Sequence, residues 1–210
     1  MTNIALILTT YHSLERIPMY KERIIWWLDN SKLDLFIVDS NNSNFDYLPE
    51  KYLNNNRLHL YSFDQRNDII KANSLYNKKG FMLITYCEVL SIKNILTKYD
   101  NLFSKYDWIF KLTGKYIIPT LEIELNNIPN NSDIIVQNRH NNIIQNSELF
   151  GFKLNKSANI FNSFDVVNVF ERSLKLLIES DNYILYRLPL LKIPPEYYIK
   201  RTNGSILGDL

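Results

Sequence analysis

The feature that most constrains the fold is the alternation of strand-like and helix-like segments over residues 1–120. Two helix-like segments, residues 19–28 and 83–98, carry apolar side chains at helical spacing. The strand-like segments are short, apolar or alternating runs that end in polar residues: 4–8, 33–38, 58–63 and 107–112. Because a helix that connects two strands favours parallel pairing, we predict an α/β fold with a mostly parallel, Rossmann-like sheet and helices on both faces.

The remaining residues have a different pattern, which predicts a small antiparallel C-terminal part. No linker-like stretch precedes them, so residues 1–210 are predicted to form a single domain. The expected elements are a strand over 133–137, a hairpin or meander around 143–144 and 148–152, a long helix over 159–179 and a strand-like tail over 184–193.

Composition excludes several classes of protein. Hydrophobic residues make up 46% of the chain, which is too many for a disordered protein. The 24 basic and 22 acidic side chains nearly cancel, so bulk charge predicts no nucleic-acid binding. The single Cys87 excludes an internal disulfide, and the scattered His12, His59 and His140 do not predict a metal site. The N-terminus lacks the basic stretch of a signal peptide, and no apolar run spans a membrane, so we expect a cytoplasmic protein.

Polar residues follow three of the predicted parallel strands. In open α/β sheets, ligands bind beyond the carboxyl ends of the strands, at the point where the strand order reverses. The residues there are Thr9, Thr10 and Tyr11 after the first strand, Asp39, Ser40 and Asn41 after the second, and Thr113, Gly114 and Lys115 after the fourth. An acid for the base or ribose, an aromatic ring for stacking and a cation for phosphate together indicate a nucleotide site.

Three segments resemble glycosyltransferases of the GT-A, nucleotide-diphospho-sugar transferase fold. Residues 4–44 resemble their opening, in which the first strand ends in a Thr/Tyr segment and the second in an Asp-Ser turn. Residues 107–119, DWIFKLTGKYIIP, are similar to a Lys/Arg-Leu-Thr-Gly-basic-Tyr stretch of small bacterial and viral proteins grouped with that fold. Residues 78–96, which include Gly80 and Glu88, are similar to the segment that precedes that stretch.

The resemblance implies an enzyme that moves a sugar from a nucleotide-sugar donor to a hydroxyl of a glycan or lipid-linked acceptor. Residues 1–120 are then the nucleotide-binding half and residues 121–210 the acceptor-side half. The expected donor-binding residues are the nine named after the strands together with Arg16, Lys79, Glu88 and Lys111. The acceptor further suggests peripheral association with the inner face of a membrane, and the oligomeric state is not indicated.

One departure from the family pattern concerns the metal. Most GT-A enzymes carry an Asp-x-Asp pair after the fourth strand, which binds Mn²⁺ or Mg²⁺ on the donor diphosphate. The corresponding residues here are Leu112-Thr113-Gly114-Lys115, with no carboxylate. We expect Lys111, Lys115 and the backbone at Gly114 to replace the metal, so that no cofactor or divalent cation is needed. The alternatives are an inactive site, or a Gly114 that makes a bulge beside a solvated Lys115.

Two glutamates are candidates for the catalytic base. Glu148 follows the donor phosphate site and is the first candidate to accept the proton of the acceptor hydroxyl. Glu171 is predicted to lie within the apolar stripe of the helix over 159–179, which requires its carboxylate to be paired or protonated. The alternatives are an exposed loop acid for Glu148 and a structural ion pair for Glu171.

Other residues also allow a structural interpretation. Asp39 can cap its own turn, Glu88 can simply favour the start of its helix, and Arg16 and Lys79 can be surface charges. The basic residues 200–205 form either a lid over the diphosphate or a frayed tail. The competing function is therefore a non-catalytic, degenerate module of the same fold that binds nucleotide or docks on a partner. A nucleotidyltransferase is disfavoured because no glycine-rich phosphate loop is present.

Overall fold

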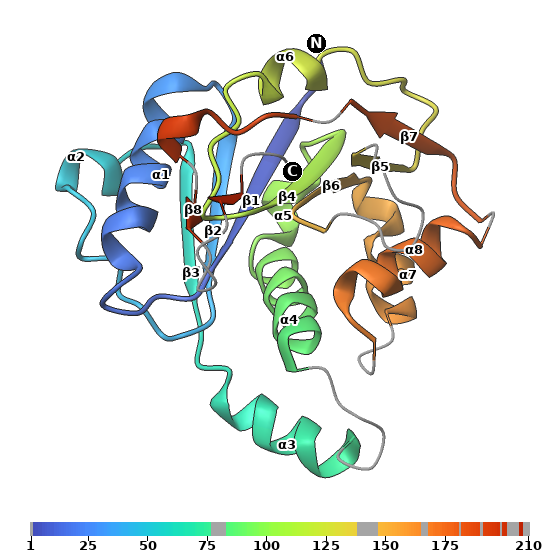
Figure 1. Ribbon diagram of the computed structural model, residues 1–210, viewed down its shortest axis with the longest axis horizontal. Coiled ribbons are helices and arrows are strands. Elements are labelled where there is room, and N and C mark those ends of the chain that lie inside the picture. Colours follow the sequence, from blue (N-terminus) through green and yellow to red (C-terminus); the bar gives the residue numbers. More distant parts are fainter. Residues whose placement is uncertain are drawn as a thin grey trace.

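A seven-stranded sheet forms the centre of the protein, with strand order β3-β2-β1-β4-β6-β5-β7 (Figure 1). The computed structural model describes residues 2–76, 83–137, 147–164, 168–180, 182–189, 191–197, 199–200 and 206–207. The strands are β1 (Ile4–Thr10), β2 (Asp34–Asp39), β3 (Leu58–Ser62), β4 (Trp108–Thr113), β5 (Ile134–Gln137), β6 (Leu149–Phe152) and β7 (Leu185–Leu188). β6 runs antiparallel to β4 and β5, and the other pairs are parallel. The predicted α/β sheet, mostly parallel with a small antiparallel part, is confirmed.

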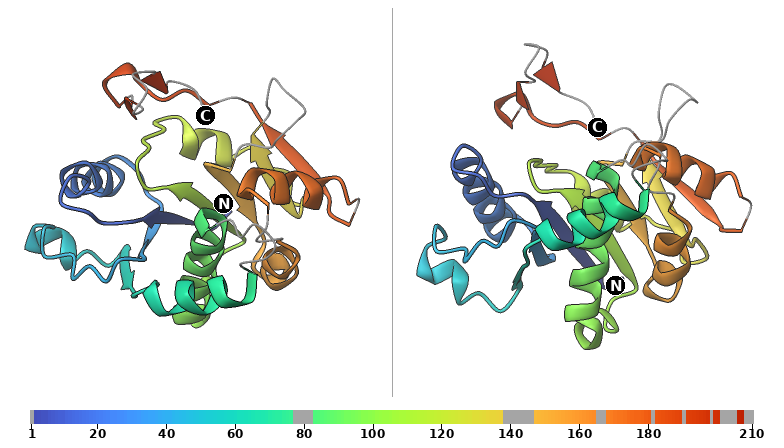
Figure 2. Two further views of the ribbon diagram at one scale, coloured as in Figure 1. Left: turned by 60° about the horizontal axis from the view of Figure 1, so that its bottom comes forward. Right: turned by 90° about the horizontal axis from the view of Figure 1, so that it is seen from below.

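Helices cover both faces of the sheet (Figure 2). One face packs against α1 (Ile17–Asn30), α2 (Glu50–Leu53) and α6 (Leu121–Leu125). The other face packs against α4 (Leu83–Lys98), α5 (Asp100–Phe103), α7 (Leu154–Ser163) and α8 (Phe170–Ile178). Side chains alternate along β1, so that Leu6 and Leu8 join the first cluster while Ala5 and Ile7 join the second. This two-sided burial explains why the strand reads as a continuous apolar run.

The prediction of one long helix over residues 159–179 is wrong. α7 ends at Ser163, α8 begins at Phe170, and the flanking Phe164 and Val169 have extended backbone conformations. The rings of Phe164 and Phe170 lie 4.6 Å apart, and both are buried in the core. Two short helices therefore bury the apolar positions that the pattern had assigned to a single stripe. Glu171 consequently lies in the first turn of α8, and Val167 of the predicted stripe lies outside the described residues.

One helix beside the carboxyl edge of the sheet was not predicted. α3 (Arg66–Tyr76) projects beyond the ends of the strands (Figure 1). It has almost no apolar stripe, since Ala72 is buried but Ile70 is 68% exposed. Hydrophobic periodicity carries no signal for a helix that packs so little of its surface.

The last part of the chain is short and irregular. A 3₁₀ turn over Pro195–Tyr197 leads to β8 (Ile199–Lys200), which pairs antiparallel with β9 (Ile206–Leu207). Residues 143–144 of the predicted hairpin and 201–205 of the predicted lid or tail lie outside the described residues. Among the helices of the described ranges, none combines the length and the hydrophobicity of a transmembrane span.

Candidate functional site

The candidate site lies where the strand order reverses between β1 and β4. The chain places β2 and β3 on one side of β1 and then crosses to β4 on the other. Thr10 pairs in register with Asp39 of β2, and Thr9 pairs with Thr113 of β4. The structure therefore brings together the three polar segments that the sequence analysis selected, because parallel strands end at one edge.

Asp39 links the segments that follow β1 and β2 and the end of β3 through hydrogen bonds to its carboxylate. Its carboxylate is fully buried, and Oδ2 lies 2.5 Å from Nδ1 of His12. Burial raises the pKa of Asp39, but the His12 ring and the backbone donors outweigh it, and the pKa lies below its usual value. The hydrogen-bond donors are the backbone N–H groups of His12, Asn41 and Ser43 and the hydroxyls of Thr10 and Ser62. The turn-capping alternative accounts for the bonds from Asn41 and Ser43. The contacts with His12, Thr10 and Ser62 instead join Asp39 to the ends of β1 and β3. The role of Asp39 in binding a base or ribose stays a prediction.

His12 extends the same network towards the following loop. Its Nε2 lies 2.5 Å from the hydroxyl of Tyr47, and its ring packs edge-on against Tyr20 and Phe45. The Asn41 side-chain amide donates to the His12 carbonyl. These contacts hold the segments after β1 and β2 in one arrangement.

The solvent side of this edge carries an aromatic ring, an amide and two cations. Tyr11 is 43% exposed, and Asn41 and Arg16 are exposed as well, whereas Ser40 is buried. Arg66 begins α3, forms an ion pair with Asp64 and lies close enough to Tyr11 for their charges to interact. The sequence analysis missed Arg66 because it missed α3. Lys79 lies outside the described residues.

Lys111 points into the protein rather than towards the edge. Its side chain is fully buried in β4, and its ammonium contacts the Glu88 carboxylate of α4. It also donates to the Ser147 carbonyl at 2.8 Å and to the Thr113 hydroxyl at 3.1 Å. A lysine ammonium has three N–H donors, so these three acceptors use all of them. Lys111 therefore has no N–H group left for the expected contact with the diphosphate of a nucleotide sugar.

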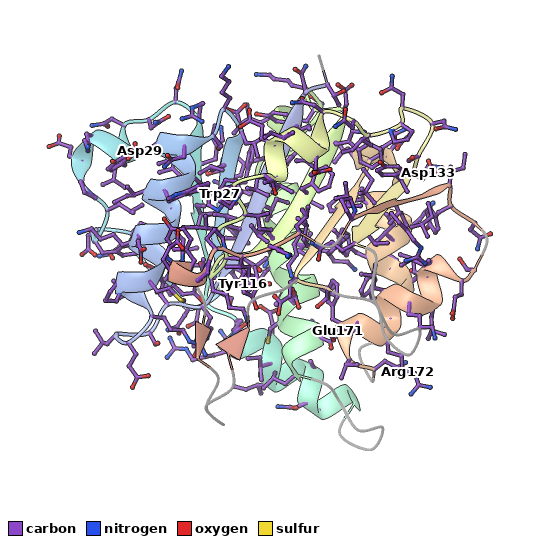
Figure 3. The ribbon with its side chains drawn as sticks, turned by 45° about the horizontal axis from the view of Figure 1, so that its top comes forward. Trp27, Asp29, Tyr116, Asp133, Glu171 and Arg172 are labelled. Carbon is purple, nitrogen blue, oxygen red and sulfur yellow. The ribbon has the colours of Figure 1, made fainter. Side chains whose placement is uncertain are left out.

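Lys115 and Glu148 form the more accessible part of the site. Lys115 is 32% exposed at its side chain, and its Nζ lies 3.6 Å from Oε1 of Glu148. The buried Tyr116, which is labelled in Figure 3, donates its hydroxyl to the same carboxylate at 3.2 Å. α1 holds this loop, since Trp27 Nε1 donates to the Tyr116 carbonyl and Arg23 Nε to that of Lys115. These two bonds from α1 therefore fix the backbone that carries the Lys115 ammonium.

Three carboxylates from distant parts of the chain gather around Lys111: Glu88, Glu148 and Glu171, which we call the glutamate cluster. Burial raises the pKa of Glu88, and the charges of Glu148 and Glu171 add to this against the effect of Lys111. Burial also raises the pKa of Glu148, but Lys115, Lys111 and hydrogen bonds from Thr113 and Tyr116 bring it below its usual value. Glu171, labelled at the start of α8 in Figure 3, accepts a hydrogen bond of 2.9 Å from the Ser147 hydroxyl.

Gly114 has a packing role that the sequence did not reveal. A Cβ at this position would lie 2.6 Å from Cγ2 of Thr10 and 3.0 Å from the Thr9 carbonyl oxygen. The Gly114 N–H donates to that same carbonyl at 2.9 Å. The glycine therefore lets the end of β4 approach β1, and its N–H bonds to protein rather than pointing at a phosphate.

The residues present do not fit the divalent cation that GT-A enzymes commonly use. Within the described ranges, no three side chains of His, Cys, Asp or Glu are placed to hold a metal ion. The glutamate cluster supplies carboxylates, but the ammonium of Lys111 stands among them.

Comparison with solved structures identifies the fold. No family model matches the sequence, and no curated protein matches it either. Mouse xyloside xylosyltransferase 1 matches with a TM-score of 0.52 at 11% identity, covering 89% of this chain and 85% of that one. A protein from Desulfovibrio desulfuricans, assigned as a nucleotide-diphospho-sugar transferase, matches with a TM-score of 0.51 at 12% identity, covering 90% of this chain and 80% of that one. A cytidylyltransferase from Leptospira borgpetersenii matches with a TM-score of 0.51 at 9% identity, covering 90% of this chain and 76% of that one.

These proteins share a fold with the chain rather than a close sequence relationship. The predicted likeness to the GT-A, nucleotide-diphospho-sugar transferase fold is confirmed at that level. All three are transferases by name, but the names differ, and a shared fold does not fix a substrate, so the substrate must be inferred from the site itself.

Proposed function

We propose that this protein is a glycosyltransferase that moves a sugar from a nucleotide-sugar donor to a hydroxyl of a glycan or glycolipid. The observation that carries this proposal is the pairing of Lys115 with Glu148 at the switch point of a GT-A-like sheet. A cation for the diphosphate and a carboxylate for the acceptor hydroxyl then lie side by side where this architecture binds ligands.

The donor would lie along the carboxyl edge from β3 to β4. Tyr11 offers a ring for the base, Asn41 offers an amide, and Arg16 and Arg66 add positive charge on the same side. Lys115 is the proposed partner of the diphosphate, because its ammonium is partly exposed and its ion pair with Glu148 is long, at 3.6 Å. No divalent metal takes part in this proposal.

Donor binding would also prepare the base. In the free protein, Lys115 helps to hold the pKa of Glu148 below its usual value, which makes this carboxylate a weak proton acceptor. A diphosphate that draws Lys115 away removes this counter-ion, so the pKa of Glu148 rises in the complex. Glu148 is therefore the proposed base, and Glu171, held by Ser147, is the second candidate.

The test is a donor screen followed by two variants. Thermal shift against UDP-, GDP- and CMP-sugars, with Mn²⁺ or with EDTA, should find one donor that stabilises the protein equally in both. Lys115→Met should abolish that shift, whereas Glu148→Gln should keep it and lose release of free nucleotide. The proposal fails if Lys115→Met binds the donor normally, or if every donor requires Mn²⁺.

The alternative is a non-catalytic module of the same fold that binds nucleotide or a partner. One observation favours it. Asp39, Lys111 and the Gly114 N–H were expected to bind the nucleotide sugar, but each of them bonds to groups of the protein instead. Donor binding without nucleotide release, in the presence of glycan and lipid-linked acceptors, would support this alternative. Recruitment to vesicles that carry a lipid-linked acceptor would test the expected association with a membrane surface.

A further inference from the structure

We infer that Lys111 is a built-in cation that takes the place of a divalent metal within the glutamate cluster, positions its carboxylates and excludes Mn²⁺ and Mg²⁺. This inference rests on the proposed function only in treating the cluster as part of the site. Lys111 is thus a positioning residue and not a ligand of the donor.

The first argument is the coordination of the ammonium. Lys111 Nζ contacts the Glu88 carboxylate, the Ser147 carbonyl and the Thr113 hydroxyl, which come from α4, the segment two residues before β6 and the end of β4. All three contacts are to oxygen, the ligand that Mg²⁺ and Mn²⁺ prefer in proteins. The Lys111 side chain is fully buried, so its ammonium is shielded from bulk solvent and depends on these protein oxygens.

The second argument is that Lys111 reaches every carboxylate of the cluster. It contacts Glu88 directly. It donates to the Thr113 hydroxyl, which in turn hydrogen-bonds Glu148. It also donates to the carbonyl of Ser147, whose hydroxyl donates to Glu171 at 2.9 Å. One ammonium therefore orders three acids that come from α4, the residue before β6 and α8.

The third argument is the balance of charge. Glu88 is 18% exposed at its side chain and lies near two further carboxylates, so its charge needs a nearby cation. If Lys111 is shortened to alanine, the cluster keeps its oxygen atoms and loses its cation. A divalent ion could then enter the space that the ammonium leaves and bind the Glu88 carboxylate, the Ser147 carbonyl and the Thr113 hydroxyl, whereas in the wild type the ammonium occupies that space.

The experiment measures thermal unfolding with and without MnCl₂ or MgCl₂, and without any nucleotide. Lys111→Ala should gain about 5–10 °C in Tm when the metal is about 100-fold above its dissociation constant. The wild type should show no such gain, nor should the matched control Lys115→Ala, which removes the neighbouring lysine but leaves Lys111 in place. Lys111→Ala combined with Glu88→Gln should lose the gain, because the principal carboxylate is gone.

The inference is overturned if Lys111→Ala folds and ignores both metals, or if the wild type gains as much as the variant. If Lys111→Ala folds only when Mn²⁺ is present, the inference is supported directly. If it does not fold under any condition, electron paramagnetic resonance of Mn²⁺ with the wild type decides. A spectrum that shows only free Mn²⁺ supports the inference that the wild type excludes the metal. A spectrum that shows one bound Mn²⁺ per chain, which Glu88→Gln releases, refutes it. Since no donor sugar is used, the result does not depend on the proposed function.

Discussion

Substituting Gly114 by alanine tests whether this glycine serves packing or phosphate binding. The added Cβ would lie 2.6 Å from Thr10 Cγ2, about 1 Å inside the usual separation of two carbon atoms. It would also lie 3.0 Å from the Thr9 carbonyl oxygen, which is backbone and cannot turn away. Thr10 itself is held, because its hydroxyl donates to the Val38 carbonyl at 3.1 Å.

Overpacking of this kind costs about 1–3 kcal/mol. For a chain of this length, that corresponds to a fall in Tm of about 2–12 °C. Thr10→Ser removes the clashing methyl group and keeps the hydroxyl, so by itself it should cost only about 1 kcal/mol. In the Gly114→Ala background the same change should be favourable, with a coupling of about 1–2 kcal/mol. Rescue should remain partial, because the contact with the Thr9 carbonyl oxygen persists.

Urea unfolding of the two single variants and the double variant gives the complete cycle. The reasoning would be refuted by a Gly114→Ala protein as stable as the wild type, or by additive effects of the two changes. The double variant should also bind the donor like the wild type, since the Gly114 N–H already donates to Thr9. A stable double variant that no longer binds donor would return the phosphate role to Gly114.

Three further expectations concern titratable groups. Asp39→Asn should lower the free energy of unfolding, measured in urea, by about 3–5 kcal/mol. The reason is that the new amide places N–H groups against the backbone N–H donors that now bond to the carboxylate. A loss under about 1 kcal/mol would contradict the capping role. The folded pKa of Glu148 lies below its unfolded value, so its contribution to stability is present near neutral pH and is lost as the pH falls through the folded pKa. The stability difference between wild type and Glu148→Gln should therefore shrink from pH 7 to pH 3, and a constant difference would exclude this assignment. Burial raises the pKa of Cys87 to about 11, so the folded thiol should react with a disulfide reagent at neutral pH roughly 100-fold more slowly than the unfolded one.

The strands and the two main helices could be predicted because the local spacing of apolar residues indicates which side chains are buried. Residues 83–98 were predicted as a helix, and α4 has these bounds. β1 and β2 were predicted to within two residues, since strands buried on both faces leave continuous apolar runs. The prediction failed for residues 159–179 because an apolar period can continue across a break, and it failed for α3 because an exposed helix leaves no period at all.

The candidate site divides in the same way. The chain order alone places Thr10, Asp39 and Thr113 at one edge of a parallel sheet, since each follows a strand. Which charges neutralise one another was not available from the sequence. Lys111 was expected on a diphosphate, yet it meets Glu88 and the Ser147 carbonyl, which lie far from it along the chain.

The sequence by itself therefore determined the sheet, the faces of its strands and the polar residues at their carboxyl ends, because these depend on hydrophobic period and chain direction. Only the tertiary structure decided that Asp39 caps its turn, that Lys111 serves the glutamate cluster and that Lys115 stays accessible. The physical reason is that a buried charge must find its partner within a few ångströms, and those distances are set by the packing of α4, β4, β6 and α8 together.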